Sequence, residues 1–81
     1  METNLNFDRL EELIKKFPKL PLVLRAGVLS RKTARTVLDL DKWQMDDLYI
    51  ALIEGGIVQG VSSGTFRATQ ATTQYLIEGG Y

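Results

Sequence analysis

The stretch that decides the fold is residues 48–69, which read LYIALIEGGIVQGVSSGTFRAT. Apolar residues recur at helical spacing in its first part, and the helix they predict ends at two glycines that can adopt the positive φ of a C-cap. Two runs rich in β-forming residues follow, at 57–61 and 65–69. The Ser-Ser-Gly sequence between them suits a hairpin turn, because its glycine can take the left-handed conformation. The stretch therefore predicts a helix that leads directly into a β-hairpin.

Helices are also expected at the two ends of the chain. Asn6 is a candidate N-cap for a first helix that Pro18 ends. The residues at helical spacing in this helix are Phe7, Leu10, Leu13, Ile14 and Phe17. Thr69 is a candidate N-cap for a last helix. The residues expected to pack in that last helix are Ala71, Tyr75 and Leu76.

Residues 19–29 leave two possibilities open. Pro21 can open a short helix through Ala26, because proline is favoured in the first turn of a helix. Alternatively, Val28 and Leu29 can form a brief strand.

Two further helices are predicted in the middle of the chain. Ser30 is a typical N-cap for a helix that runs to about Leu38. The residues expected to face inward from it are Ala34, Val37 and Leu38. Asp41 and Gln44 have the spacing of a capping box for the next helix, which ends near Glu54. Its helical phase places four residues in the core: Met45, Leu48, Tyr49 and Leu52.

Composition limits the classes of function. The chain has 81 residues, 44% of them hydrophobic and 25% charged, which suits one domain with a small core. It contains no cysteine and no histidine, so we expect no disulfide, no metal site and no catalysis that depends on these residues. No carboxylate pair or phosphate-binding loop stands out. We therefore expect neither an enzyme nor a cofactor nor a small-molecule substrate.

The N-terminal residues and the longest apolar run indicate where in the cell the protein is expected. The N-terminal residues are acidic and polar, unlike a signal peptide. The longest apolar run, residues 20–24, is far too short to span a membrane. A cytoplasmic protein that does not contact membranes is expected, folded as one domain over residues 1–81, with residues 1–5 and 79–81 flexible.

The charges are segregated although the net charge is zero. Residues 15–35 contain seven basic residues and no acidic one, whereas residues 1–14 sum to −3 and residues 36–81 to −4. A neutral total therefore conceals a basic segment that could face phosphate groups. The alternative is a set of solvated helix faces on a protein with a balanced surface.

This order of elements resembles the winged helix-turn-helix superfamily. The residues that carry the resemblance are Val37-Leu38-Asp39-Leu40-Asp41 at the turn, 48–57 in the third helix, and Phe66-Arg67-Ala68-Thr69 followed by Tyr75-Leu76. The chain is also similar to small prophage proteins of the YjcQ type. The resemblance implies an α+β fold with three or four helices, a two-stranded antiparallel hairpin as the wing, and a C-terminal helix. It further implies a DNA-binding regulator or accessory factor, often a dimer.

The resemblance implies that the helix 41–54 enters a major groove of duplex DNA while the hairpin touches the flanking backbone. The outward face of this helix argues against that role, because it carries Asp47 and Glu54 and no basic residue except Lys42 at the helix start. DNA contacts are therefore expected mainly before the turn and on the wing. The candidate DNA-binding residues are Arg31, Lys32, Arg35, Lys42, Gln44, Ser62, Ser63, Thr65 and Arg67.

The same helix face suggests a rival function. Trp43 and Ile50, rimmed by Asp47 and Glu54, have the composition of a protein interface, in which an aromatic anchor is surrounded by polar residues. This hypothesis makes the chain a docking module or homodimer that does not bind DNA. The ordinary interpretation of Trp43, slightly favoured, is that its side chain folds back against the domain.

Overall fold

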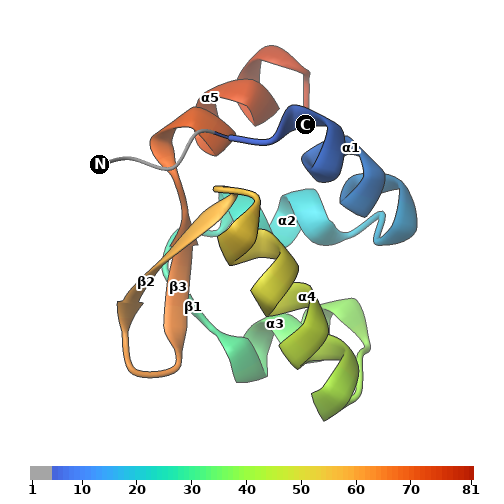
Figure 1. Cartoon of the computed structure of the whole chain (residues 1–81), viewed down its shortest axis with the longest axis vertical. Helices are drawn as coiled ribbons and strands as arrows, with labels where there is room; N and C mark the ends of the chain where they lie inside the picture. The colour runs from blue at the N-terminus through green and yellow to red at the C-terminus, as the bar shows by residue number, and fades with distance from the viewer. Residues whose placement is uncertain (1–4) are drawn as a thin grey trace.

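Five helices and three strands follow one another in the computed structural model, which describes residues 5–81 (Figure 1). In chain order they are α1 (Phe7–Lys16), α2 (Leu20–Arg25), β1 (Leu29–Ser30), α3 (Arg31–Leu38), α4 (Lys42–Glu54), β2 (Val58–Ser62), β3 (Thr65–Ala68) and α5 (Gln70–Glu78). The expected α+β class is confirmed. Figure 1 shows α3 and the first turns of α4 at one end of the molecule, and α1 with α5 at the other.

The sheet contains one strand more than the predicted hairpin. Its order is β1-β3-β2 with antiparallel pairing throughout, and Phe66 on the central strand pairs with Leu29 on one side and Gly60 on the other. The register shifts between Gly60 and Ser62. The segment 19–29 contains the short helix, α2, and leads into a brief strand, β1, that lies at Leu29–Ser30 instead of the expected Val28 and Leu29.

Local capping signals determine where the helices begin. The Asn6 side chain accepts a hydrogen bond from the Arg9 amide. At the start of α4 the Gln44 amide donates to Asp41 Oδ1 (2.8 Å) and the Asp41 amide donates to Gln44 Oε1 (3.0 Å), which confirms the capping box. Of the glycines predicted to adopt positive φ, Gly56 (67°) after α4 and Gly64 (80°) in the hairpin turn do so, whereas Gly55, the C-cap of α4, has φ of −82°.

The core lies between α4, the sheet and the remaining helices. Its largest fully buried side chains are Phe66, Leu10, Leu20, Leu52, Ile57, Leu76 and Val23. The inward phase predicted for α4 is confirmed: Met45, Leu48 and Leu52 are buried and Tyr49 packs against the core. Tyr49 contacts Phe66, with ring centroids 5.6 Å apart, and so joins α4 to the central strand.

Two residues predicted to face inward are exposed. Val37 is exposed because the row of α3 that packs inward runs through Ala34 and Leu38, one turn apart. Ala71 is exposed because the inward row of α5 runs through Thr72 and Leu76. The Thr72 hydroxyl is hydrogen-bonded to the hydroxyl of Thr69, so this buried polar group is satisfied.

The two ends of the described chain are tied to the body of the domain. Of the residues expected to be flexible, 1–4 lie outside the described residues. Leu5 is buried in the core, and the main-chain oxygen of Tyr81 accepts a hydrogen bond from Arg25 at 2.6 Å. The flexibility expected at residues 5 and 79–81 stays a prediction. Within residues 5–81, none of the helices combines the length and the apolar character needed to cross a bilayer.

Candidate nucleic-acid interface

Four predicted DNA-binding residues line one shallow groove between α3 and α4. The residues of the groove are Arg31, Lys32, Arg35, Lys42, Met45 and Asp46. The first three bases come from α3, the fourth comes from the start of α4, and Met45 and Asp46 come from the next turn of α4. We call this surface the basic groove. Figure 1 shows α3 and the first turns of α4, which supply these residues, at the same end of the molecule.

Contacts within the domain hold two of these arginines in place. The Arg31 guanidinium lies 4.9 Å from the centroid of the Tyr49 ring, within cation–π range. Arg35 Nε donates a hydrogen bond to the main-chain oxygen of Leu40 in the turn, at 3.1 Å. The turn itself depends on Asp39, whose left-handed backbone (φ 55°) ends α3. Both cations are therefore oriented before any ligand arrives.

The charge of the basic groove is not neutralised internally. None of its four bases forms an ion pair within residues 5–81, where the one ion pair joins Arg9 to Glu54 at 3.6 Å. Asp46 is the only carboxylate in the groove lining. The groove therefore presents a net positive surface to solvent.

Three of the four bases occupy positions that the helix macrodipole disfavours. Arg31 and Lys32 begin α3, and Lys42 begins α4, where the partial positive charge of the helix end repels a cation. Bases also stand at the starts of two other helices, since Arg9 lies in the first turn of α1 and Lys19 is the N-cap of α2. What distinguishes Arg31, Lys32 and Lys42 is that they come together on one groove.

The basic segment 15–35 does not form one surface. Lys15 and Lys16 lie in the last turn of α1, and Lys19 is the N-cap of α2. Arg25 ends α2 and is hydrogen-bonded to the main chain of Tyr81. Only the last three bases of the segment line the groove, and Lys42 joins them from outside it.

The hairpin turn adjoins the groove but uses its polar side chains internally. The Arg31 amide donates to the main-chain oxygen of Gly64 (2.9 Å), which places the turn beside the start of α3. The hydroxyls of Ser62 and Thr65 are hydrogen-bonded to each other at 2.6 Å, and the Ser62 amide donates to Thr65 Oγ1. Ser63 is exposed in the turn. Two of the three residues predicted to contact DNA here, Ser62 and Thr65, thus stabilise the turn through their own hydrogen bonds.

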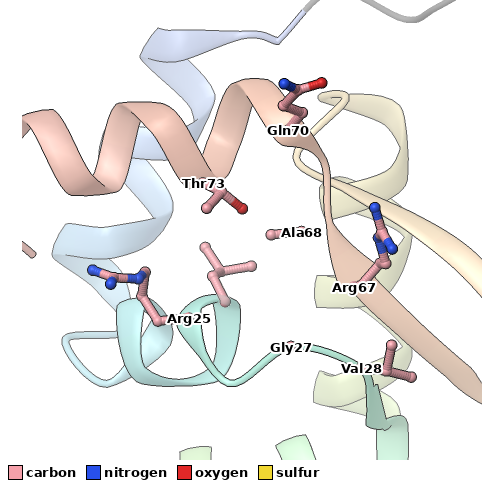
Figure 2. Close-up of a pocket in the computed structure, with 8 residues that line it drawn as sticks. Arg25, Gly27, Val28, Arg67, Ala68, Gln70 and Thr73 are labelled. Carbon is pink, nitrogen blue, oxygen red and sulfur yellow. The ribbon is translucent and has the colours of Figure 1, made fainter.

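Gln44 and Arg67 are placed apart from the groove. Gln44 uses its side-chain oxygen in the capping box of α4. Arg67 is on the outer face of β3, since its neighbours Phe66 and Ala68 are buried. It lines a second hollow with Arg25, Val28, Gln70 and Thr73, in which α2 and α5 supply residues that the sequence did not single out (Figure 2).

The outward face of α4 is open to solvent. Trp43 is 75% exposed and Ile50 is 54% exposed, so the interpretation that Trp43 folds back against the domain is wrong. Asp47 is also exposed, whereas Glu54 is engaged in the ion pair with Arg9.

No His, Cys, Asp or Glu cluster of the kind that holds a metal ion occurs within residues 5–81. Comparison of the chain with protein-family models, with curated proteins and with solved structures finds no match in any of the three.

Proposed function

We propose that this protein is a winged-helix DNA-binding protein, a cytoplasmic regulator or accessory factor that acts by binding and not by catalysis. The arrangement supports the winged-helix assignment: α3, a tight turn and α4 are followed at once by the β2–β3 hairpin, the order that the resemblance implies. The basic groove contacts the DNA duplex, and the adjoining hairpin turn lies against the same stretch of the sugar–phosphate backbone.

The observation that carries the proposal is the convergence of four unpaired cations from two helices on one groove. Phosphate contacts by lysine and arginine release counterions from DNA, and this electrostatic gain supplies most of the non-specific affinity. Arg31 and Arg35 are already oriented by Tyr49 and Leu40, so less side-chain freedom is lost on binding.

The cations at the helix starts support the same conclusion. A base in the first turn costs about 0.3–1 kcal/mol of stability at an exposed site. Local rules of this kind are broken chiefly at functional sites. Arg9 and Lys19 break it too, outside the groove. The gathering of Arg31, Lys32 and Lys42 around one groove is what favours a role for their charge in binding an anion.

The acids of α4 determine the kind of contact. Asp46 lines the groove and Asp47 is exposed one residue later, so this helix face repels phosphates as it approaches a major groove. It also offers no arginine to a guanine edge. We therefore expect backbone contacts, which position a protein on DNA, and little discrimination between base sequences.

The test is duplex binding at low and at physiological salt, measured by fluorescence anisotropy. The triple variant Arg31→Glu, Lys32→Glu, Arg35→Glu should lose binding. The matched control is Lys15→Glu, Lys16→Glu, Lys19→Glu, which changes the net charge equally, starts from the same segment and leaves the groove intact. It should bind within a few-fold of the wild type. Equal loss in the two variants, both folded by circular dichroism, contradicts the assignment of this surface.

A second candidate function rests on the exposure of Trp43 and Ile50 on one face of α4. In this proposal the domain docks onto a protein partner or a second copy of itself through that face. Sedimentation of the wild type against Trp43→Ala with Ile50→Ser tests the homodimer. If the variant keeps the wild-type mass, this face is not the self-association interface.

A further inference from the structure

Trp43 follows Lys42, a residue of the basic groove, at the start of α4. Its ring is 75% exposed, and Lys42 Nζ lies 6.0 Å from the ring centroid. Lys42 itself lines the groove, together with the three bases of α3. An exposed aromatic ring therefore stands beside one unpaired cation of the groove, Lys42.

This combination fits a strand whose bases are unpaired. A basic groove tracks the phosphate backbone, while an aromatic side chain supplies a platform on which a base stacks, as in proteins that bind single strands. In intact duplex DNA the base faces are already stacked on one another, so the indole of Trp43 would have no base face to contact.

We propose that Trp43 stacks on an unpaired base of a strand held in the basic groove, so that the protein prefers DNA with a single-stranded segment to fully paired DNA. This inference rests on the proposed function of the groove, and it names the form of DNA that the groove takes. Arg31, Lys32, Arg35 and Lys42 hold the phosphates, and Trp43 contacts the base.

The positions of the neighbouring residues favour this role for Trp43 over that of a protein anchor. Ile50 lies seven residues, about two turns, further along α4 than Trp43 and does not line the groove, whereas the residue next to the Trp43 ring is the groove cation Lys42. Asp46 and Asp47, one turn beyond Trp43, repel phosphates. A bound strand therefore runs along the Lys42 side of the ring.

The chain contains a single tryptophan, so its intrinsic tryptophan emission reports on Trp43 alone. We would titrate the full chain with three labelled ligands: a blunt duplex, the same duplex with an unpaired oligothymidine tail, and the single-stranded tail. Anisotropy of the label gives the affinity and tryptophan emission gives the stacking. The tailed duplex should bind about fivefold or more tightly than the blunt one and should quench Trp43.

Three variants make the test specific. Trp43→Ala should weaken binding of the tailed duplex roughly 5- to 150-fold, the range that one stacked base spans, and leave blunt-duplex affinity unchanged. Trp43→Phe should retain part of the preference, because the phenyl ring still stacks. Ile50→Ala, on the same exposed helix face, should retain all of it.

The possible failures are distinguishable. Equal affinity for blunt and tailed duplex with unchanged Trp43 emission, in a protein whose groove triple variant loses binding, overturns the stacking proposal and leaves the proposed function standing. Absence of binding to all three ligands overturns both. A change of sedimenting mass in Trp43→Ala, without an effect on DNA affinity, assigns Trp43 to a protein interface and overturns the stacking proposal.

Discussion

Tyr75 joins α5 to α1 through one hydrogen bond and one ring contact. Its phenol donates to the Glu11 carboxylate, and its ring lies 5.4 Å from that of Phe7, centroid to centroid. The bond requires the phenol proton, so the hydrogen bond to Glu11 raises the pKa of Tyr75 from its usual 10.0 to about 12. A pKa raised by folding means that the bond stabilises the fold fully below pH 10 and is lost as the pH rises towards 12.

Tyr75→Phe should therefore remove a stabilising contribution that is present at neutral pH and is lost at alkaline pH. The difference in free energy of unfolding between wild type and variant should be constant from neutral pH to about pH 10 and should shrink between pH 10 and 12. Urea unfolding at several pH values measures it. A wild-type-to-variant difference that does not vary with pH would contradict the role of the Glu11 bond.

Asp39 holds the turn between α3 and α4 in a left-handed conformation, with φ of 55°. Such a conformation costs a residue with a Cβ about 1–2 kcal/mol, less for Asp and Asn because their short side chains bond locally. Asp39→Ala should thus lower the free energy of unfolding by about 1 kcal/mol, and Asp39→Gly should leave it unchanged or raise it. Denaturant unfolding of the two variants beside Asp39→Asn tests this. Equal stability of the Ala and Gly variants would show that the backbone conformation is not limiting.

The helix macrodipole should make a lysine-to-glutamate change stabilising at the start of α3 and destabilising at the end of α1. Lys32→Glu at the start of α3 should raise the free energy of unfolding by about 0.3–1 kcal/mol while weakening DNA binding. Lys15→Glu in the last turn of α1 should lower the free energy of unfolding by a similar amount without affecting binding. Thermal unfolding and anisotropy on the same samples separate the two effects. A Lys32→Glu variant that is both less stable and weaker in binding would show that Lys32 has a structural role.

The elements that sequence predicted well are those with local signals. The Asp41–Gln44 capping box and the glycines at 56 and 64 specify their conformations within a few residues, so α4 and the hairpin turn were predicted close to their observed bounds. Strand β1 is two residues long and exists because Leu29 and Ser30 pair with β3, more than thirty residues away. A pairing across that separation leaves no local pattern, which is why residues 19–29 stayed ambiguous.

At the scale of the whole molecule, the basic groove was predicted in part. Arg31, Lys32 and Arg35 were found because they share one helix, and Lys42 was found separately. The way α4 crosses α3 brings the four bases together and places the Tyr49 ring against the Arg31 guanidinium. The same crossing leaves Trp43 in solvent, which the helical phase alone did not decide.

The placement of charge, and not its total, should govern DNA binding. The wild type has zero net charge. If each of the four groove bases contacts one phosphate, a plot of its log affinity against log salt concentration should have a slope near −3.6, since each phosphate contact on B-DNA contributes about −0.9. The double variant Lys32→Glu, Glu12→Lys keeps the net charge at zero but moves one base from the groove to an exposed position on α1. Its slope should become shallower, about −2.7, because one phosphate contact is lost. Its affinity at low salt should fall with it, since the transferred lysine lies outside the groove. An unchanged slope in this variant would mean that DNA responds to the overall field of the protein, and the groove would no longer be the binding site.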